Sequence, residues 1–258
     1  NAVLRIWKQY GCVPADAYSG KLEGQTHHDH SKMFEEMETY LMSLQQSNAW
    51  NERAAIETIR SIMDHYIGCP PETITYDGRE MTPLEFLHNE VKVDPDEYVD
   101  FLSFMSSPYG ERAEYEVEDN WWHGDHYNNI PLDDFMDAIK NSVENGYTVC
   151  LGGDVSESGY FPMKDVAMVP TYDIPSAYID ENARLFRFLN ETTTDDHAIH
   201  IVGSKQAEDG VTWFLIKDSG SGARNGRNKG YYFYHEDYIK LKMTTFMVHQ
   251  SAVEEYLR

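Results

Sequence analysis

The chain has 258 residues, which is enough for one large or two small domains with a sizeable core. Hydrophobic residues make up 41% of it and aromatic residues 13%, a composition typical of folded rather than disordered proteins. Its formal net charge of -23 would repel phosphate backbones and anionic lipids, and it contains no run of eighteen apolar residues, so the sequence argues against nucleic-acid binding and against a membrane role.

The first residues have the pattern of an amphipathic helix. Its apolar members are Val3, Leu4, Ile6 and Trp7. The segment has no secretion signal, and a natural protein rarely begins inside a helix that lacks a cap. We therefore expect an N-terminal part of the protein to be missing from this sequence or to be cleaved from it.

Helical patterns dominate the first two thirds of the chain. Apolar residues at helical spacing predict helices over Ser31–Leu44, Trp50–Tyr66, Thr82–His88 and Leu132–Asn145. Between the second and third of these, the pair Asp77-Gly78 predicts the two-residue turn of a short hairpin. Met105–Asn129 is irregular, aromatic and acidic, and we expect it to wrap a surface.

After Gly146 the pattern changes to short aromatic and β-branched runs between glycine-rich turns. These runs predict strands over Tyr147–Leu151, His197–Val202, Val211–Ile216, Tyr231–Tyr234 and Thr244–Val248. Helices followed by an antiparallel sheet are typical of the α+β class. We therefore divide the chain into a helical part, 1–145, and a β-rich part, 146–258.

One histidine stands where it can serve as the base of a cysteine nucleophile. Such a nucleophile needs a base that removes the thiol proton and a third group that orients the base. His197 begins one predicted strand, and Asp218 follows the next strand after a short turn at Glu208–Gly210. Because adjacent antiparallel strands bring such positions together, we expect Asp218 to accept a hydrogen bond from one ring nitrogen of His197 and to leave the other nitrogen facing a thiol.

Collinear motifs surround these two residues. The histidine lies in DDHAIHIVG, and the aspartate lies in WFLIKDSGSG, which is followed by KGYYFY. Further motifs are YGCVP, GCPPETITYDG, MTPLEF, YNNIPLDDFMDAIKNSVENGYTV, GYTVCLGGDVS and FMVHQSAV. Together they resemble the C-terminal portion of papain-like cysteine peptidases, in the bleomycin hydrolase and bacterial aminopeptidase C branch. The resemblance runs over nearly the whole chain.

The resemblance implies a papain-like α+β fold, in which a helical lobe and an antiparallel β-rich lobe enclose the active site in the cleft between them. It also implies a cysteine peptidase that needs no cofactor and forms a thioester with its peptide substrate. The usual activity in this branch is that of an aminopeptidase. His197 would be the general base and acid, and Asp218 would orient it. Asp196, Ala198 and Cys150 would contact substrate. A homo-oligomer and a cytoplasmic location are further implications, although export stays open.

The sequence departs from the family pattern at three points. Asp218 replaces the family's orienting asparagine, and Gly220 stands where a tryptophan shields the contact. The box that supplies the glutamine and the nucleophilic cysteine is absent. Cys12 and Cys69 follow helices, and Cys150 lies inside a predicted strand, so none sits at the helix N-terminus that favours a thiolate. We expect the nucleophile upstream of Asn1, in a missing part or on a separate fragment.

Three alternatives stay open at this point. A catalytically inactive homologue that binds or scaffolds would keep the fold and lose the cysteine. A metal-dependent hydrolase would use the cluster His27–His30, which we interpret instead as a polar segment leading into a helix. The chain ends shortly after its last family motif, so an endopeptidase also remains open.

Trp121-Trp122-His123 is interpreted as a surface anchor, with an aromatic wall of a substrate groove as the alternative.

Overall fold

The computed structural model describes residues 2–156 and 158–257. These residues form two compact units, Ala2–Pro95 and 96–257. The sequence suggests a different division, at 145/146, between the helical and the β-rich lobe that would enclose a catalytic cleft. That division stays a prediction. The two units are described separately below.

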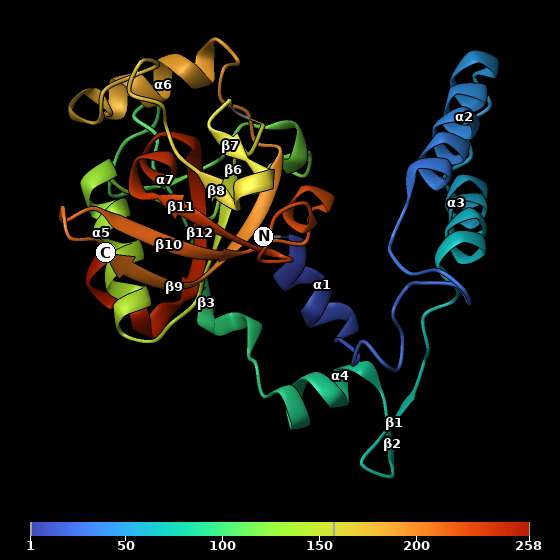
Figure 1. The fold of residues 1–258 in the computed structure, drawn as a ribbon. Coiled ribbons are helices and arrows are strands. Elements are labelled where there is room, and N and C mark those ends of the chain that lie inside the picture. The colour runs from blue at the N-terminus through green and yellow to red at the C-terminus, as the bar shows by residue number, and fades with distance from the viewer. Residues whose placement is uncertain (1, 157, 258) are drawn as a thin grey trace. The chain divides into compact units, whose positions relative to one another are not determined.

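The unit Ala2–Pro95 is mainly helical. Its helices are α1 (Ala2–Tyr10), α2 (Ser31–Ser47), α3 (Glu52–Ile67) and α4 (Pro83–Phe86), the last continued by a π-helical turn over Leu87–Val91. Helices α2 and α3 pack against each other (Figure 1). The hairpin of β1 (Ile74–Tyr76) and β2 (Arg79–Met81) turns at Asp77 and Gly78, both of which have positive φ as the predicted turn requires.

Gly11 fits its place only because it has no side chain. Its φ is +72°, and a Cβ atom there would lie 2.2 Å from the carbonyl oxygen of Pro83. Gly24 has a similar φ of +86° but nothing within 4 Å. We expect Gly24→Ala to cost about 1–2 kcal/mol of unfolding free energy for the left-handed backbone alone. Gly11→Ala should cost more, because the backbone clash is added; equal losses in denaturant unfolding would contradict this account.

The unit 96–257 is built on one ten-stranded sheet. Its strands are β3 (Tyr98–Leu102), β4 (Arg112–Ala113), β5 (Tyr127–Asn129), β6 (Val149–Gly153), β7 (Tyr160–Phe161), β8 (Val166–Ala167), β9 (His197–Gln206), β10 (Thr212–Lys217), β11 (Tyr231–His235) and β12 (Met243–His249). They lie in the order β4-β5-β3-β12-β6-β9-β10-β11-β8-β7. All neighbours are antiparallel except the parallel pairs β3–β5 and β8–β11.

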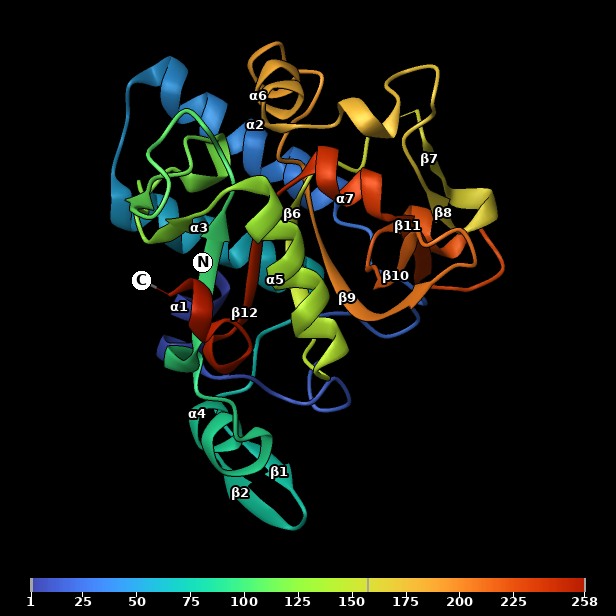
Figure 2. The same cartoon turned by 90° about the vertical axis from the view of Figure 1, so that its left-hand side faces the viewer.

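Helix α5 (Leu132–Glu144) covers one face of this sheet (Figure 2). It buries Phe135 and Ile139 completely. The ring of Phe135 meets Phe246 of β12 edge to face at 5.0 Å, and Phe246 in turn stacks on Phe101 of β3 at 4.7 Å. The remaining helices are α6 (Glu181–Leu189) and α7 (Glu236–Lys242), with short 3-10 segments at Pro95–Glu97, Glu118–Asn120, Pro162–Lys164, Ser176–Tyr178, Ser221–Arg224, Gln250–Ala252 and Glu254–Tyr256.

The α+β class is confirmed, and each predicted helix and strand is present within a few residues of its expected bounds. The sheet also contains strands that the sequence pattern did not reveal, including β4 and β5 within the segment expected to be irregular. β4 and β5 have two and three residues and pair with each other, and β5 also pairs with β3, a five-residue strand that was likewise not predicted. Among the helices of the described residues, none is both long and apolar enough to cross a membrane.

Candidate active site

Two neighbouring strands position the predicted histidine and carboxylate. His197 is the first residue of β9 and lies opposite Gly153 of β6. On its other side β9 pairs with β10, whose last residue, Lys217, lies opposite His200. Asp218 follows Lys217 directly, and its own N–H donates to the carbonyl of Gly230 at 2.9 Å. The sheet register therefore brings Asp218 back toward the start of β9.

The side chains of His197 and Asp218 are in contact. The Nε2 atom of His197 lies 2.8 Å from Oδ1 of Asp218, and since an ionised carboxylate only accepts, the imidazole is the donor. Oδ1 also accepts the N–H of Gly220 at 2.7 Å, and Oδ2 accepts the hydroxyl of Tyr160 at 3.4 Å. The side chain of Asp218 is 1% exposed and that of His197 is 26% exposed. A buried, fully held carboxylate thus fixes one ring nitrogen, while the ring keeps access to solvent.

This contact shifts the pKa of both partners. The hydrogen bond to Asp218 raises the pKa of His197 above its ordinary value, against the lowering effect of burial. Burial would raise the pKa of Asp218, but the hydrogen bonds from His197 and from the N–H of Gly220 outweigh it and hold that pKa below its ordinary value. The pair is therefore an imidazolium–carboxylate pair between these two pKa values, and it becomes neutral imidazole beside carboxylate as the pH rises further.

Replacing Asp218 by asparagine is expected to lower the pKa of His197. Asparagine can still accept the hydrogen bond, but it removes the negative charge that favours imidazolium, whereas the burial that favours neutral imidazole remains. Titration of the His197 ring resonances by NMR measures this directly. Asp209→Asn, on the exposed turn between β9 and β10, removes the same charge and is the control. An unchanged or higher His197 pKa in Asp218→Asn would contradict this role for the carboxylate.

Gly220 places no side chain beside the contact. A Cβ atom at this position would lie 3.1 Å from Oδ1 of Asp218 and 3.6 Å from Nε2 of His197. Any side chain placed there would therefore begin directly beside the hydrogen bond. The glycine has an ordinary φ of -57°, so its backbone does not require glycine. Position 220 is thus where a shielding side chain would stand, and this chain has none.

The three predicted substrate-contacting residues lie near His197 but differ in environment. Ala198 and Asp196 are exposed, whereas Cys150 is half-buried. Cys150 lies opposite His200, and Gly152 lies opposite Ala198, so Gly152 is the direct neighbour of Ala198 across the strands. Residues two apart in a strand share a face, which places Cys150, Gly152 and Ala198 on one face of the sheet. Their contact with substrate stays a prediction.

The segment that leads into β9 is held by its own hydrogen bonds. Asp196 donates its N–H to the carbonyl of Gly153 at 3.0 Å, and its carboxylate accepts the N–H of Val155 at 3.0 Å. Asp154, 1% exposed, accepts the N–H of Thr194 at 3.1 Å. Lys242, also 1% exposed, lies 3.9 Å from the Asp154 carboxylate. Buried charges therefore fix the backbone just before the histidine.

The environments of the three cysteines all disfavour a thiolate. Burial raises the pKa of Cys12. A hydrogen bond with Asp64, followed by the charge of that carboxylate, raises the pKa of Cys69. Burial and then the charge of Asp100 raise the pKa of Cys150. An activated nucleophilic cysteine needs the opposite shift.

The cluster His27–His30 is built around a local turn. Asp29 accepts hydrogen bonds from the N–H and the hydroxyl of Ser31, at 3.0 and 2.7 Å, where α2 begins. The rings of His28 and His30 lie 5.5 Å apart. In the part of the chain that the structure describes, no three His, Cys, Asp or Glu side chains are arranged to hold a metal ion.

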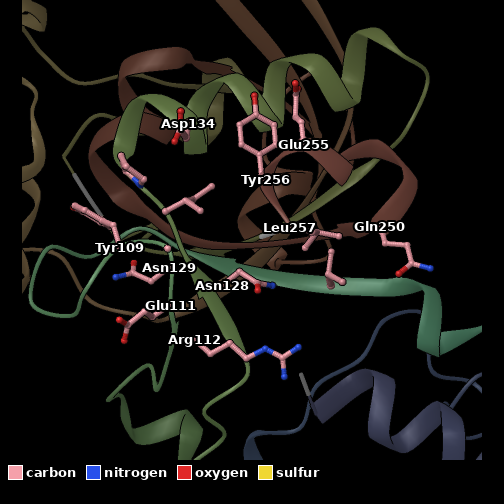
Figure 3. A pocket seen from close by; sticks show the side chains of 14 residues that line it. Tyr109, Glu111, Arg112, Asn128, Asn129, Asp134, Gln250, Glu255, Tyr256 and Leu257 are labelled. Atoms are coloured by element: carbon pink, nitrogen blue, oxygen red, sulfur yellow. The ribbon is translucent and has the colours of Figure 1, made fainter.

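A cavity of about 830 Å³ lies elsewhere in the unit 96–257 (Figure 3). In the figure, Glu111 and Arg112 lie along one side and Glu255 and Tyr256 along the other. The described residues that line it include none of the five predicted site residues, which are Cys150, Asp196, His197, Ala198 and Asp218. We assign no ligand to this cavity.

Structure comparison identifies a solved structure with the same fold. PepW from Lactobacillus rhamnosis matches with a TM-score of 0.67 over 98% of this chain at 16% sequence identity, and the chain spans 62% of the length of PepW. Matches with TM-scores of 0.35 and 0.24 are SERA5E from Plasmodium falciparum and the Amb a 11 cysteine protease of ragweed pollen. The SERA5E match has 15% sequence identity and covers 95% of this chain and 80% of SERA5E. The Amb a 11 match has 18% identity and covers 39% of this chain and 23% of Amb a 11.

No curated protein matches the chain in sequence. The model of the peptidase C1-like family, in contrast, matches residues 1–257. This match and the PepW fold confirm the resemblance to papain-like cysteine peptidases that the motifs around His197 and Asp218 indicated. The chain belongs to the peptidase C1-like family of papain-like cysteine peptidases.

Proposed function

We propose that this chain carries the histidine side of a cysteine-type aminopeptidase, which hydrolyses peptide bonds through a thioester. The observation that carries the proposal is the hydrogen bond from Nε2 of the partly exposed His197 to the buried carboxylate of Asp218. It orients the imidazole and leaves Nδ1 as the nitrogen available to a reacting group. Asp218 would act as a positioning residue and His197 as the general base and acid.

The residues would share the reaction in two steps. His197 Nδ1 takes the proton of a cysteine thiol, the thiolate attacks the peptide carbonyl carbon, and the imidazolium returns the proton to the amine as it leaves. A water then attacks the thioester with His197 again removing a proton, which releases the carboxylic acid and restores the thiol. The Asp218 carboxylate remains ionised throughout and stabilises the imidazolium that forms in each step.

The nucleophile in this proposal is a cysteine outside positions 1–258. The pKa values of Cys12, Cys69 and Cys150 are all raised, which is wrong for an attacking thiolate. The chain spans 62% of the length of PepW, so a relative of this fold has a substantial further part. In this chain's case, that part or a separate fragment would supply the thiol. A peptide substrate and a homo-oligomer belong to the same proposal.

Anilide hydrolysis by the intact protein tests the proposal. An N-terminally free alanine anilide and its N-acetylated form separate aminopeptidase from endopeptidase activity. The proposal predicts release of aniline from the free form, weak release from the blocked form, and loss of both after thiol alkylation. Hydrolysis that survives alkylation would refute the thiol mechanism, and equal rates on both forms would refute the aminopeptidase assignment.

The lack of a side chain at Gly220 favours one second candidate, a catalytically inactive homologue that binds peptides. A residue at this position with a side chain would pack beside the Asp218–His197 hydrogen bond, and in this chain only burial of the Asp218 carboxylate, 1% exposed, protects that bond from solvent. The same anilides discriminate the two candidates. An inactive homologue would bind them with no release of aniline before or after reduction of its thiols.

A further inference from the structure

Asp195 differs from the other carboxylates around the start of β9. Asp154, Asp196 and Asp218 each accept a backbone N–H, as their hydrogen bonds to Ser156, Val155 and Gly220 show. For Asp195, two residues before His197, the described residues provide no hydrogen bond to its carboxylate. The residue is half-buried, so the missing partner costs free energy.

The Asp195 carboxylate is directed toward the strand surface that carries Ala198. Its Oδ1 lies 3.6 Å from the point where a Cβ atom of Gly152 would stand, and Gly152 lies opposite Ala198. A Cβ there would also lie 2.5 Å from Oγ1 of Thr245, so a side chain at this position would displace the Thr245 hydroxyl. Gly152 therefore places no side chain between Asp195 and the exposed Ala198, which adjoins the candidate catalytic histidine.

The surroundings of Asp195 favour a cation. Burial, followed by the negative charges of Asp119 and Asp196, raises the pKa of its carboxyl group to about 7. Asp119 and Asp196 are both exposed. A positively charged group at this position would restore the ionised form and replace the absent hydrogen bonds. A neutral donor could supply a hydrogen bond but not the charge, and an acidic group would repel the carboxylate.

We propose that Asp195 selects substrates by binding an ammonium or guanidinium group on the acyl side of the cleaved bond, next to His197. The inference rests on the proposed function, because it assumes that Ala198 and Gly152 face substrate. The cation is either the α-amino group of a peptide N-terminus or a basic side chain. In both cases it forms a charged hydrogen bond with Asp195. Because the Asp195 carboxyl group ionises as pH rises through about 7, selection of a lysine or arginine side chain strengthens from pH 6 to 8, whereas selection of an α-amino group, which loses its own proton at about pH 8, is strongest between the two pKa values.

The test measures binding in the His197→Ala background of the intact protein, so that turnover does not consume the ligands. Two pairs of ligands separate the sources of the cation. The first pair is alanine anilide and its N-acetylated form; the second is acetyl-lysyl-alanine anilide and its norleucine counterpart. Calorimetry at pH 8 should show roughly tenfold or tighter binding of the cationic member of one pair. The pair that shows it identifies the cation.

Adding Asp195→Asn should reduce that preference to near equality, whereas adding Asp209→Asn, which removes the same charge from the exposed β9–β10 turn, should preserve it. Equal binding within both pairs, or a preference that survives Asp195→Asn, would overturn the inference. The proposed function is tested separately: it fails if the protein that retains His197 releases no aniline. Ligand preference is measured whether or not the protein turns over.

Discussion

Replacing His197 by alanine is expected to lower kcat/KM of the intact protein for alanine anilide by roughly 10³-fold or more. The imidazole both takes the thiol proton and returns it to the leaving amine, so its loss affects every step that moves a proton. Steady-state hydrolysis across a range of substrate concentrations measures the effect. The loss should appear mainly in kcat, because His197 acts on the reacting groups rather than on substrate binding.

His200→Ala provides a matched control for this prediction. His200 lies three residues along the same strand, opposite Cys150 and Lys217, and has no part in the contact with Asp218. Its removal should leave kcat/KM within a few-fold of the unsubstituted protein. A comparable loss in both variants would indicate damage to the sheet, and activity that survives His197→Ala would refute the assigned role.

Replacing Asp154 by alanine is expected to cost about 3–5 kcal/mol of unfolding free energy. Asp154 and Lys242 are both 1% exposed and lie 3.9 Å apart, so the substitution removes a carboxylate from beside a buried ammonium group that also donates to the carbonyl of Thr192 and the hydroxyl of Thr193. It also removes the acceptor of the Ser156 and Thr194 N–H groups. Denaturant unfolding measures the change, and Glu208→Ala on the exposed turn between β9 and β10 is the control, with an expected change within about 0.5 kcal/mol.

The pH dependence of the Lys242 contribution provides an independent check. Burial lowers the pKa of Lys242 from 10.5 to about 8, so between these values the unfolded chain binds more protons at this site than the folded chain. The contribution of Lys242 to stability therefore rises as pH increases from 8 to 10. Compared with Lys242→Met, the unsubstituted protein should gain stability over this range. A constant difference, or an Asp154→Ala loss below about 1 kcal/mol, would contradict a buried charge pair.

The sequence predicted those parts of the fold that depend on local patterns. The alternation in HAIHIV and the Asp77-Gly78 turn appear in β9 and in the β1–β2 hairpin as expected. Strands β4 and β5 were not predictable from such patterns, because two or three residues have no measurable periodicity. β4 pairs with β5, and β5 pairs with β3, whose position in the sheet is set by β12, more than 140 residues away in sequence.

The candidate site divides in the same way. His197 and Asp218 lie on consecutive strands, so simple register reasoning was sufficient to bring them together. Tyr160, which also reaches Asp218, comes from β7, 58 residues earlier, and no motif marks it. Gly152 was missed because Cys150 appeared the more informative neighbour of Ala198; the pair of glycines in LGGD was the available signal. The environment of Asp195 depends on Asp119, whose approach results from tertiary folding alone.

Mapping of the reactive thiol tests the central claim most directly. The intact protein would be treated with a limiting amount of iodoacetamide, and the first alkylated cysteine would be identified by mass spectrometry, with and without His197→Ala. Our account predicts one fast-reacting cysteine outside positions 1–258 whose alkylation slows when His197 is removed, because the imidazolium no longer stabilises its thiolate. The account would be contradicted if Cys12, Cys69 or Cys150 were alkylated fastest, or if the alkylation rate were the same with and without His197→Ala.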